Sequence, residues 1–181
     1  MKGRLIYVVG PSGSGKDSVI QYARERLSVN SNVVFAQRTI TRPASAGGED
    51  HTAATEAEFG RLLAAGRFSM HWRANGLAYG IGSEIRDWLA AGRTVVVSGS
   101  RAHISDALEV FPRLEVVMVT ASFETLKSRL DARGRENATQ VSRRLERGAS
   151  IKLPSGTHAL EIRNDGAIAE SGARFLAFLG Y

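Results

Sequence analysis

The chain has 181 residues, of which 43% are hydrophobic and 23% charged, a composition that is typical of a globular protein and excludes a disordered or collagen-like chain. No apolar run reaches the roughly 18 residues that a membrane span requires, and the absence of cysteine excludes disulfides, thiol nucleophiles and cysteine-ligated metals. The net charge is +6 and all but four of the 24 basic residues are arginine, so anionic partners are favoured. We expect a single domain of a soluble, cytoplasmic protein.

Short apolar runs alternate along the chain with segments of helical periodicity. The first run, at residues 4–9, is rich in β-branched side chains and ends at a glycine, as expected of a strand buried in a parallel sheet. Further strands are predicted at 33–36, 94–97, 114–120 and 158–164, and helices at 16–27, 55–65, 83–91, 101–109, 122–133, 138–150 and 167–179. Residues 41–54 are polar and residues 66–82 look irregular, so this middle part is interpreted as an insertion. The alternation predicts an α/β fold with a mostly parallel sheet covered by helices on both faces.

A glycine-rich segment follows the first strand directly. Residues 10–16 match the first seven positions of the phosphate-binding loop GxxxxGK[ST], with a predicted strand before the match and a predicted helix after it. Glycines let backbone N–H groups turn toward a phosphate, and the helix start adds its positive dipole end. A glycine-rich turn beside a surface lysine is the structural alternative, and the two correct flanks disfavour it. The residues predicted to bind nucleotide are Gly10, Pro11, Ser12, Gly13, Ser14, Gly15, Lys16, Asp17 and Ser18.

The eighth position of this loop departs from the pattern. Asp17 stands where a serine or threonine coordinates Mg²⁺, and Ser18 comes one residue later. A carboxylate is a suitable hard-oxygen ligand, so Asp17 is predicted to bind the metal directly or through water. Two alternatives stay open: Ser18 shifts inward to the metal, or Asp17 only stabilises the start of the helix.

Two arginines and two carboxylates come after the second predicted strand. Arg38 and Arg42 flank two threonines, and Glu49 and Asp50 follow two glycines. In doubly wound sheets the carboxyl end of such a strand faces the ligand crevice. Pro43 biases Arg42 toward an extended backbone, which suits an arginine that projects toward a ligand. We interpret the segment as anion-binding, with a solvated turn as the alternative.

A dense group of basic residues surrounds Gly134, after the fourth predicted strand. Phosphoryl transfer needs cations over the charge that develops on the transferring oxygens, and a lid that carries arginines would supply them. A solvated basic helix is the alternative. The group consists of Arg129, Arg133, Arg135, Arg143, Arg144 and Arg147.

Two other ligand classes are not expected. The four histidines have no metal-ligand spacing and no cysteine partners, which argues against a zinc site. The basic residues are spread along α/β elements without a nucleic-acid-binding motif, so we expect no nucleic acid partner and no membrane partner.

Several motifs together resemble the nucleoside monophosphate kinases, and guanylate kinases in particular. They are the loop at 10–18, Thr41-Arg42-Pro43 with Gly48-Glu49, Tyr79-Gly80, the run 129–134, Arg144-Leu145 and Asn164-Asp165. Guanylate kinases carry carboxylates where this chain has His71, Ser98 and Ser100, so the residues that read guanine are missing. The segments GPSGSGKDS, RTITRPA, NGLAYGIG, VVVSGSRAH and RLDARGREN resemble the family of ribose 1,5-bisphosphate phosphokinases more closely.

This resemblance implies a P-loop kinase fold with an acceptor-binding insertion at about 37–82 and a lid at about 133–144. It implies ATP and Mg²⁺ as cofactors and transfer to ribose 1,5-bisphosphate, giving 5-phospho-α-D-ribose 1-diphosphate in phosphonate catabolism. The acceptor phosphate is already ionised, so no general base is required. The implied roles are catalysis for Lys16, Arg133 and Arg144, nucleotide binding for Arg129, Asn164 and Asp165, metal binding for Asp17, and acceptor binding for Arg38, Arg42, Glu49, Tyr79, Ser100 and Arg101. A guanylate or other nucleoside monophosphate kinase and a catalytically silent binding module are the alternatives.

Overall fold

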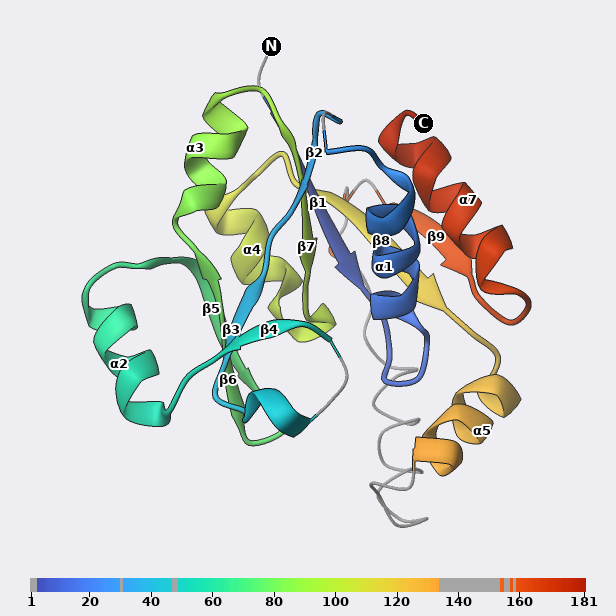
Figure 1. Ribbon diagram of the computed structural model, residues 1–181, viewed down its shortest axis with the longest axis horizontal. Helices are drawn as coiled ribbons and strands as arrows, with labels where there is room; N and C mark the ends of the chain where they lie inside the picture. Colours follow the sequence, from blue (N-terminus) through green and yellow to red (C-terminus); the bar gives the residue numbers. More distant parts are fainter. Residues whose placement is uncertain (1–2, 30, 47–48, 134–153, 155–156, 158) are drawn as a thin grey trace. The chain divides into compact units, whose positions relative to one another are not determined.

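The computed structural model describes residues 3–29, 31–46, 49–133, 154, 157 and 159–181. The chain divides into two compact units, whose helices and strands are labelled in Figure 1. Unit 1 comprises Met1–Ile6, Ser31–Val97 and Asp106–Leu114, and unit 2 comprises Tyr7–Asn30, Ser98–Ser105 and Glu115–Tyr181. Each unit is assembled from segments far apart in the sequence. The organisation of residues 1–181 as one kinase domain stays a prediction.

One sheet has the strand order β2-β7-β1-β8-β9. Its strands are β1 (Arg4–Val9), β2 (Val33–Phe35), β7 (Thr94–Ser98), β8 (Glu115–Thr120) and β9 (Ala159–Arg163). β2 pairs with β7 and β8 with β9, both in parallel. Every residue of β7 and the last five residues of β1 are buried. Strands covered on both faces have no polar side to alternate with, which explains their continuous apolar runs and confirms the predicted mostly parallel sheet.

The helices follow the predicted segments. They are α1 (Lys16–Arg26), α2 (Glu56–Ala64), α3 (Glu84–Ala90), α4 (Ile104–Val110), α5 (Phe123–Arg133) and α7 (Ile168–Leu179). The segment predicted as one helix at 101–109 begins with a 3₁₀ turn, Arg101–His103, before α4. The predicted helix at 138–150 lies outside the described residues. Among the described residues no helix is long and apolar enough to cross a membrane.

The segment interpreted as an insertion contains a second sheet, so the expectation of an irregular segment at 66–82 is wrong. β5 (Phe68–Ala74) and β6 (Leu77–Gly82) form an antiparallel hairpin. Asn75 and Gly76 connect them with φ angles of 51° and 76°, the backbone of a tight two-residue hairpin turn that Asn-Gly favours. The Asn75-Gly76 dipeptide is therefore a sequence signal for a hairpin at this position.

The polar stretch that follows β2 adds two short strands to this second sheet. They are β3 (Arg38–Ile40) and β4 (His51–Ala53), and the sheet has the order β4-β3-β6-β5. β3 pairs in parallel with β4 and antiparallel with β6. Strands of three residues are too short to show a sequence period, and these two, unlike β2, are not continuous apolar runs, so the sequence predicts a loop here.

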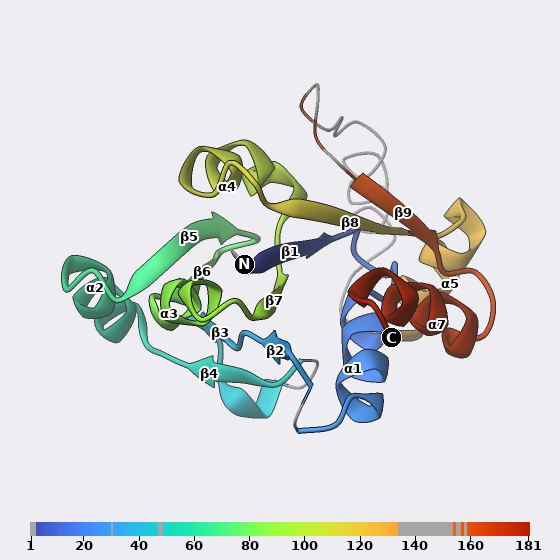
Figure 2. The same cartoon turned by 90° about the horizontal axis from the view of Figure 1, so that it is seen from above.

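α1 and α7 pack against each other in unit 2 (Figure 2). The contact includes Gly172 on α7, where a side chain would overlap the ring of Tyr22 on α1. The guanidinium of Arg26 covers the same ring, with its carbon 3.5 Å from the ring centroid. The tyrosine is thus held between a cation and a bare stretch of helix backbone.

We predict that Gly172→Ala destabilises the protein by about 1–3 kcal/mol, because the new methyl group must displace a packed ring. Glycine to alanine in a helix ordinarily stabilises by roughly 0.5–1 kcal/mol. Gly60 on α2 provides the matched control, since nothing lies within 4 Å of a Cβ built there, and Gly60→Ala should raise stability. Denaturant unfolding of both variants measures the difference, and a stabilised Gly172→Ala would contradict the packing described here.

Candidate active site

The glycine-rich loop connects β1 to α1 in unit 2. Gly13 and Gly15 have φ angles of 87° and 80°, a backbone region that side-chain-bearing residues rarely adopt. α1 begins at Lys16, and its N-cap residue Gly15 offers no capping side chain. A helix start with unsatisfied N–H groups is an anion-binding arrangement. The loop therefore has the backbone that its sequence motif predicts.

Two of the predicted nucleotide-binding residues brace this loop. Asn164 is buried and donates from Nδ2 to the carbonyl oxygen of Ser14 at 2.7 Å, while its Oδ1 accepts from Ser171 Oγ at 2.9 Å. Arg129 Nη1 lies 3.3 Å from the carbonyl oxygen of Gly13 and 3.4 Å from that of Ser14. Both residues thus supply donors to loop carbonyls.

Asp165, the neighbour of Asn164, holds two segments of unit 2 together. Its Oδ1 accepts from the backbone N–H of Ser122 at 2.6 Å, and its Oδ2 pairs with Arg163. The Arg163 guanidinium first, and the Ser122 N–H second, hold the pKa of the Asp165 carboxyl far below its usual value. The carboxylate stays ionised through the whole physiological range of pH.

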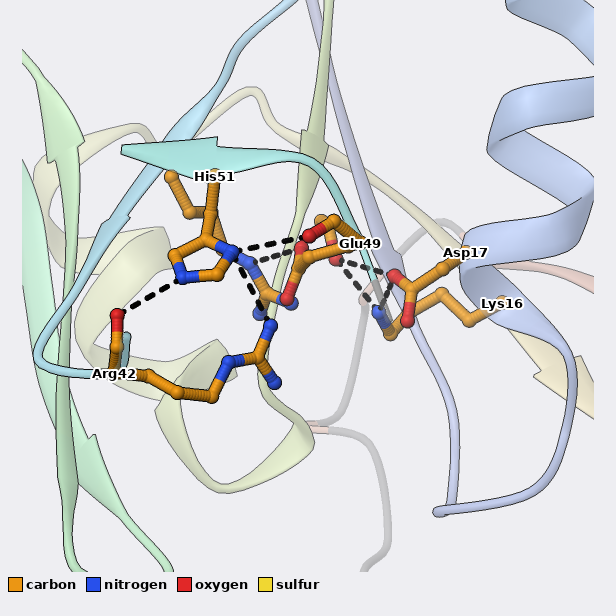
Figure 3. Close-up of polar contacts among 7 residues, drawn as sticks. Lys16, Asp17, Arg42, Glu49 and His51 are labelled. Carbon is orange, nitrogen blue, oxygen red and sulfur yellow. Dashed lines mark hydrogen bonds and ion pairs between the residues drawn. The ribbon is translucent and has the colours of Figure 1, made fainter. Parts of the chain in front are cut away.

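Lys16, Asp17 and Ser98 meet at the start of α1 (Figure 3). The ammonium of Lys16 pairs with Asp17 Oδ1 and donates to Ser98 Oγ at 2.6 Å. Ser98 Oγ in turn donates to Asp17 Oδ1 at 3.1 Å. Ser98 is the buried last residue of β7, whereas the side chain of Asp17 is 48% exposed. A carboxylate and a hydroxyl, both hard oxygen donors, are therefore adjacent beside the loop lysine.

Ser100 and Arg101 follow Ser98 in unit 2. The backbone N–H of Ser100 donates to the hydroxyl of Tyr7 at 3.1 Å, and that fully buried ring leaves no room for a side chain at Gly99. Arg101 opens the 3₁₀ turn and is half-buried, and burial lowers the pKa of its guanidinium. Packing against Tyr7 thus fixes the backbone from which Ser100 and Arg101 project.

In unit 1, the two predicted acceptor arginines have different partners. Arg38 forms a two-pronged ion pair with Glu49, with Nε 2.8 Å from Oε2 and Nη2 against Oε1. The side chains of Arg38 and Glu49 are 8% and 15% exposed, so water screens this pair little. Arg42 instead meets a histidine, since its Nη2 lies 3.3 Å from Nδ1 of His51.

Tyr79 connects the Arg38 pair to the hairpin. Its ring stacks on Trp72, the residue opposite it in the β5–β6 register, at a centroid distance of 5.4 Å and an interplanar angle of 3°. The guanidinium carbon of Arg38 lies 5.2 Å from the Tyr79 ring centroid. The hairpin thus places three of the predicted acceptor residues, Arg38, Glu49 and Tyr79, in one cluster.

The predicted lid is only partly described. Arg133 is the last residue of α5. Arg144 and the rest of the predicted lid at 133–144 lie outside the described residues. Their catalytic roles stay predictions.

Sequence reasoning left two residues out of the predicted site. Ser98 was read only as a missing guanine-reading carboxylate, although a polar residue that ends a buried parallel strand is a signal for the ligand edge of the sheet. His51 was set aside because it lacks metal-ligand spacing. The contacts of His51 with Arg42 and Glu49 form only when the 42–51 loop folds, and no local sequence pattern predicts them.

The chain is similar to known proteins in both sequence and structure. A family model described as an AAA domain matches residues 6–148. The ribose 1,5-bisphosphate phosphokinase PhnN of Thiobacillus denitrificans is 48% identical over 178 residues, which cover 98% of this chain and 93% of that protein. The protein of the same name from Laribacter hongkongensis is 51% identical over 177 residues, which cover 98% of this chain. That relative is longer, and this chain spans only 42% of its length.

A solved structure confirms the fold. The guanylate kinase from Anaplasma phagocytophilum superposes with a TM-score of 0.68 at 18% identity, and the match covers 99% of this chain and 85% of that one. Likeness at this identity concerns the fold alone, whereas the sequence matches extend over nearly every residue. The chain belongs to the ribose 1,5-bisphosphate phosphokinase family and has the fold of the guanylate kinase-like P-loop kinases.

Proposed function

We propose that this chain is a ribose 1,5-bisphosphate phosphokinase. An oxygen of the 1-phosphate attacks the γ-phosphorus of ATP, the bond from that phosphorus to the β-phosphate oxygen breaks, and the products are 5-phospho-α-D-ribose 1-diphosphate and ADP. The observation that carries the proposal is near-complete coverage by a relative of that name at 48% identity, in a chain that keeps the first seven positions of the phosphate-binding loop. The proposed reaction belongs to phosphonate catabolism, as the resemblance to this family implies.

Unit 2 would bind ATP and its metal. The loop N–H groups and Lys16 would hold the phosphates, and Arg129 and Asn164 keep the loop in shape through its carbonyls. The Asp17 carboxylate and the Ser98 hydroxyl fit Mg²⁺, which takes one or two carboxylates and otherwise phosphate and water oxygens. When bound, the metal supplies charge neutralisation on the phosphates.

The acceptor needs cations rather than a base. A phosphate monoester loses its second proton near pH 6, so its oxygen is already a nucleophile at neutral pH. Arg42 and Arg101 would bind the acceptor phosphates, and the Arg38, Glu49 and Tyr79 cluster would line the sugar side. Lys16 and the arginines of the lid, Arg133 and Arg144, would neutralise charge on the transferring group.

Lys16→Ala should lower kcat by at least about 100-fold, because this cation acts on charge that develops during transfer. Lys127→Ala is the matched control, since Lys127 pairs with Asp131 on the exposed surface of α5. Steady-state rates with ATP and the bisphosphate, together with circular dichroism, measure the effect. A folded Lys16→Ala variant with near-normal kcat would remove this residue from the catalytic role.

Asp17→Asn should raise the Mg²⁺ concentration for half-maximal activity by about tenfold, because an amide oxygen keeps lone pairs but loses the charge that attracts a dication. Calorimetry should show weaker binding of ATP with Mg²⁺ but not of ATP without it. Asp131→Asn on α5 controls for the loss of one carboxylate. An unchanged Mg²⁺ titration would assign Asp17 to stabilising the helix start.

The identity of the acceptor distinguishes the candidate functions. We expect kcat/KM for ribose 1,5-bisphosphate to exceed that for GMP by at least about 10³, because a site without acceptors for the guanine N–H groups leaves them unpaired. Coupling to a phosphoribosyltransferase identifies the product. Comparable turnover of GMP would favour the nucleoside monophosphate kinase alternative, and consumption of neither substrate would favour the silent module.

A further inference from the structure

His51 contacts both ends of the loop that carries the acceptor residues. The side chain is buried at the start of β4. Nε2 lies 3.1 Å from the backbone carbonyl oxygen of Arg42, and Nδ1 lies 3.0 Å from the carbonyl oxygen of Glu49. Nδ1 also lies 3.3 Å from Nη2 of Arg42 (Figure 3). One imidazole therefore touches the backbone and the guanidinium of the same arginine.

The protonation of the ring decides which contacts are attractive. A neutral imidazole with its hydrogen on Nε2 donates to the Arg42 carbonyl and accepts from the Arg42 guanidinium at Nδ1. This tautomer binds Arg42 at both points, and it leaves the Glu49 carbonyl oxygen facing the lone pair of Nδ1 rather than a ring N–H. With the hydrogen on Nδ1, the ring would donate to the Glu49 carbonyl. Its Nδ1–H would then face an N–H of the Arg42 guanidinium, and two donors repel each other. The charged groups around the ring are Arg42, Arg38 opposite it in the β3–β4 register, and Glu49, which Arg38 already pairs.

The two arginines of this cluster differ in the charge that remains for a ligand. Glu49 cancels the charge of Arg38, and the Glu49 carboxylate accepts from two nitrogen atoms of the Arg38 guanidinium. Arg42 has no carboxylate partner within the described ranges, and its Nε is buried without a hydrogen-bond partner there. A neutral imidazole fixes the direction of a guanidinium and leaves its positive charge uncancelled. Arg42 is thus oriented and still able to bind an anion.

We propose that His51 is a positioning residue for acceptor binding: it holds the Arg42 guanidinium, through Nδ1, in the orientation that receives an acceptor phosphate. This inference rests on the proposed function only in taking the acceptor to carry a phosphate group. Fixing the long arginine side chain beforehand lowers the entropy lost when the phosphate binds.

Two substitutions separate the two nitrogen atoms of the ring. His51→Asn places the amide oxygen Oδ1 where Nδ1 was and keeps an acceptor for Arg42. His51→Gln places an amide nitrogen near the former Nε2 and keeps only the donor to the Arg42 carbonyl. We expect His51→Gln to raise KM for ribose 1,5-bisphosphate by about tenfold, the loss expected for one hydrogen bond to a charged group. His51→Asn should stay within about threefold of wild type, and neither variant should change KM for ATP.

A double-mutant cycle with Arg42→Ala tests whether the effect passes through the arginine. His51→Gln should add nothing once Arg42 is alanine. Calorimetric titration with ribose 1,5-bisphosphate, and separately with GMP, compares the acceptor affinities of the variants in the absence of turnover. Thermal unfolding of each variant reports its stability.

The outcomes separate this inference from the proposed function. Equal losses in both His51 variants, losses in neither, parallel loss of ATP affinity, or an undiminished effect in the Arg42→Ala background would each overturn the role of His51. Wild-type protein that binds the bisphosphate without phosphorylating it would overturn the proposed function, and the binding data would still decide on His51. If GMP is the true acceptor, the same split between the variants should appear with GMP. Wild-type protein that binds neither acceptor overturns both.

Discussion

A phosphate-binding loop must turn its N–H groups toward an anion, and its carbonyl groups then need donors of their own. In this protein Asn164 supplies a donor to Ser14 at 2.7 Å, and Arg129 lies against the carbonyls of Gly13 and Ser14. Asn164 comes directly after β9 and Arg129 lies on α5, so the loop depends on elements more than 100 residues away in the chain. Buried carbonyls without such partners would cost roughly 1–3 kcal/mol each. The later part of unit 2 is thereby needed to keep the loop between β1 and α1 in shape.

Much of the secondary structure could be predicted from the sequence because it depends on residues that are close together in the chain. The strand, loop and helix at residues 4–26 are written in one continuous stretch, with an apolar run, spaced glycines and a helical period. The start of α2 is equally local, since Thr55 Oγ1 accepts from the Glu58 N–H at 3.1 Å and the Glu58 carboxylate accepts from the Thr55 N–H at 2.7 Å. Each of these features depends on residues within a few positions of one another.

The features that sequence reasoning missed depend on contacts between distant residues. β3 and β4 are three residues long, and they become strands only when β6 provides hydrogen-bond partners for β3 and β3 provides them for β4. The hydroxyl of Ser98 lies 81 residues from Asp17 in the sequence, and only the packing of unit 2 brings the two together. In many P-loop enzymes a loop hydroxyl and a strand carboxylate hold the metal. Here the carboxylate of Asp17 lies in the first turn of α1 and the hydroxyl of Ser98 ends β7, an arrangement that is visible only once both positions are known to be neighbours.

The hairpin also restricts how the length of this chain can change. Tyr79 faces Trp72 because the two residues are opposite each other in the β5–β6 register. Side chains alternate between the two faces of a strand, so a single inserted or deleted residue within β6 would turn Tyr79 to the opposite face and away from Arg38. Two residues added symmetrically at the exposed Asn75-Gly76 turn, one to each strand, would extend the ladder without disturbing that stack. Evolution of this segment should therefore proceed by paired changes at its tip, while the part of the hairpin beside Arg38 keeps its length.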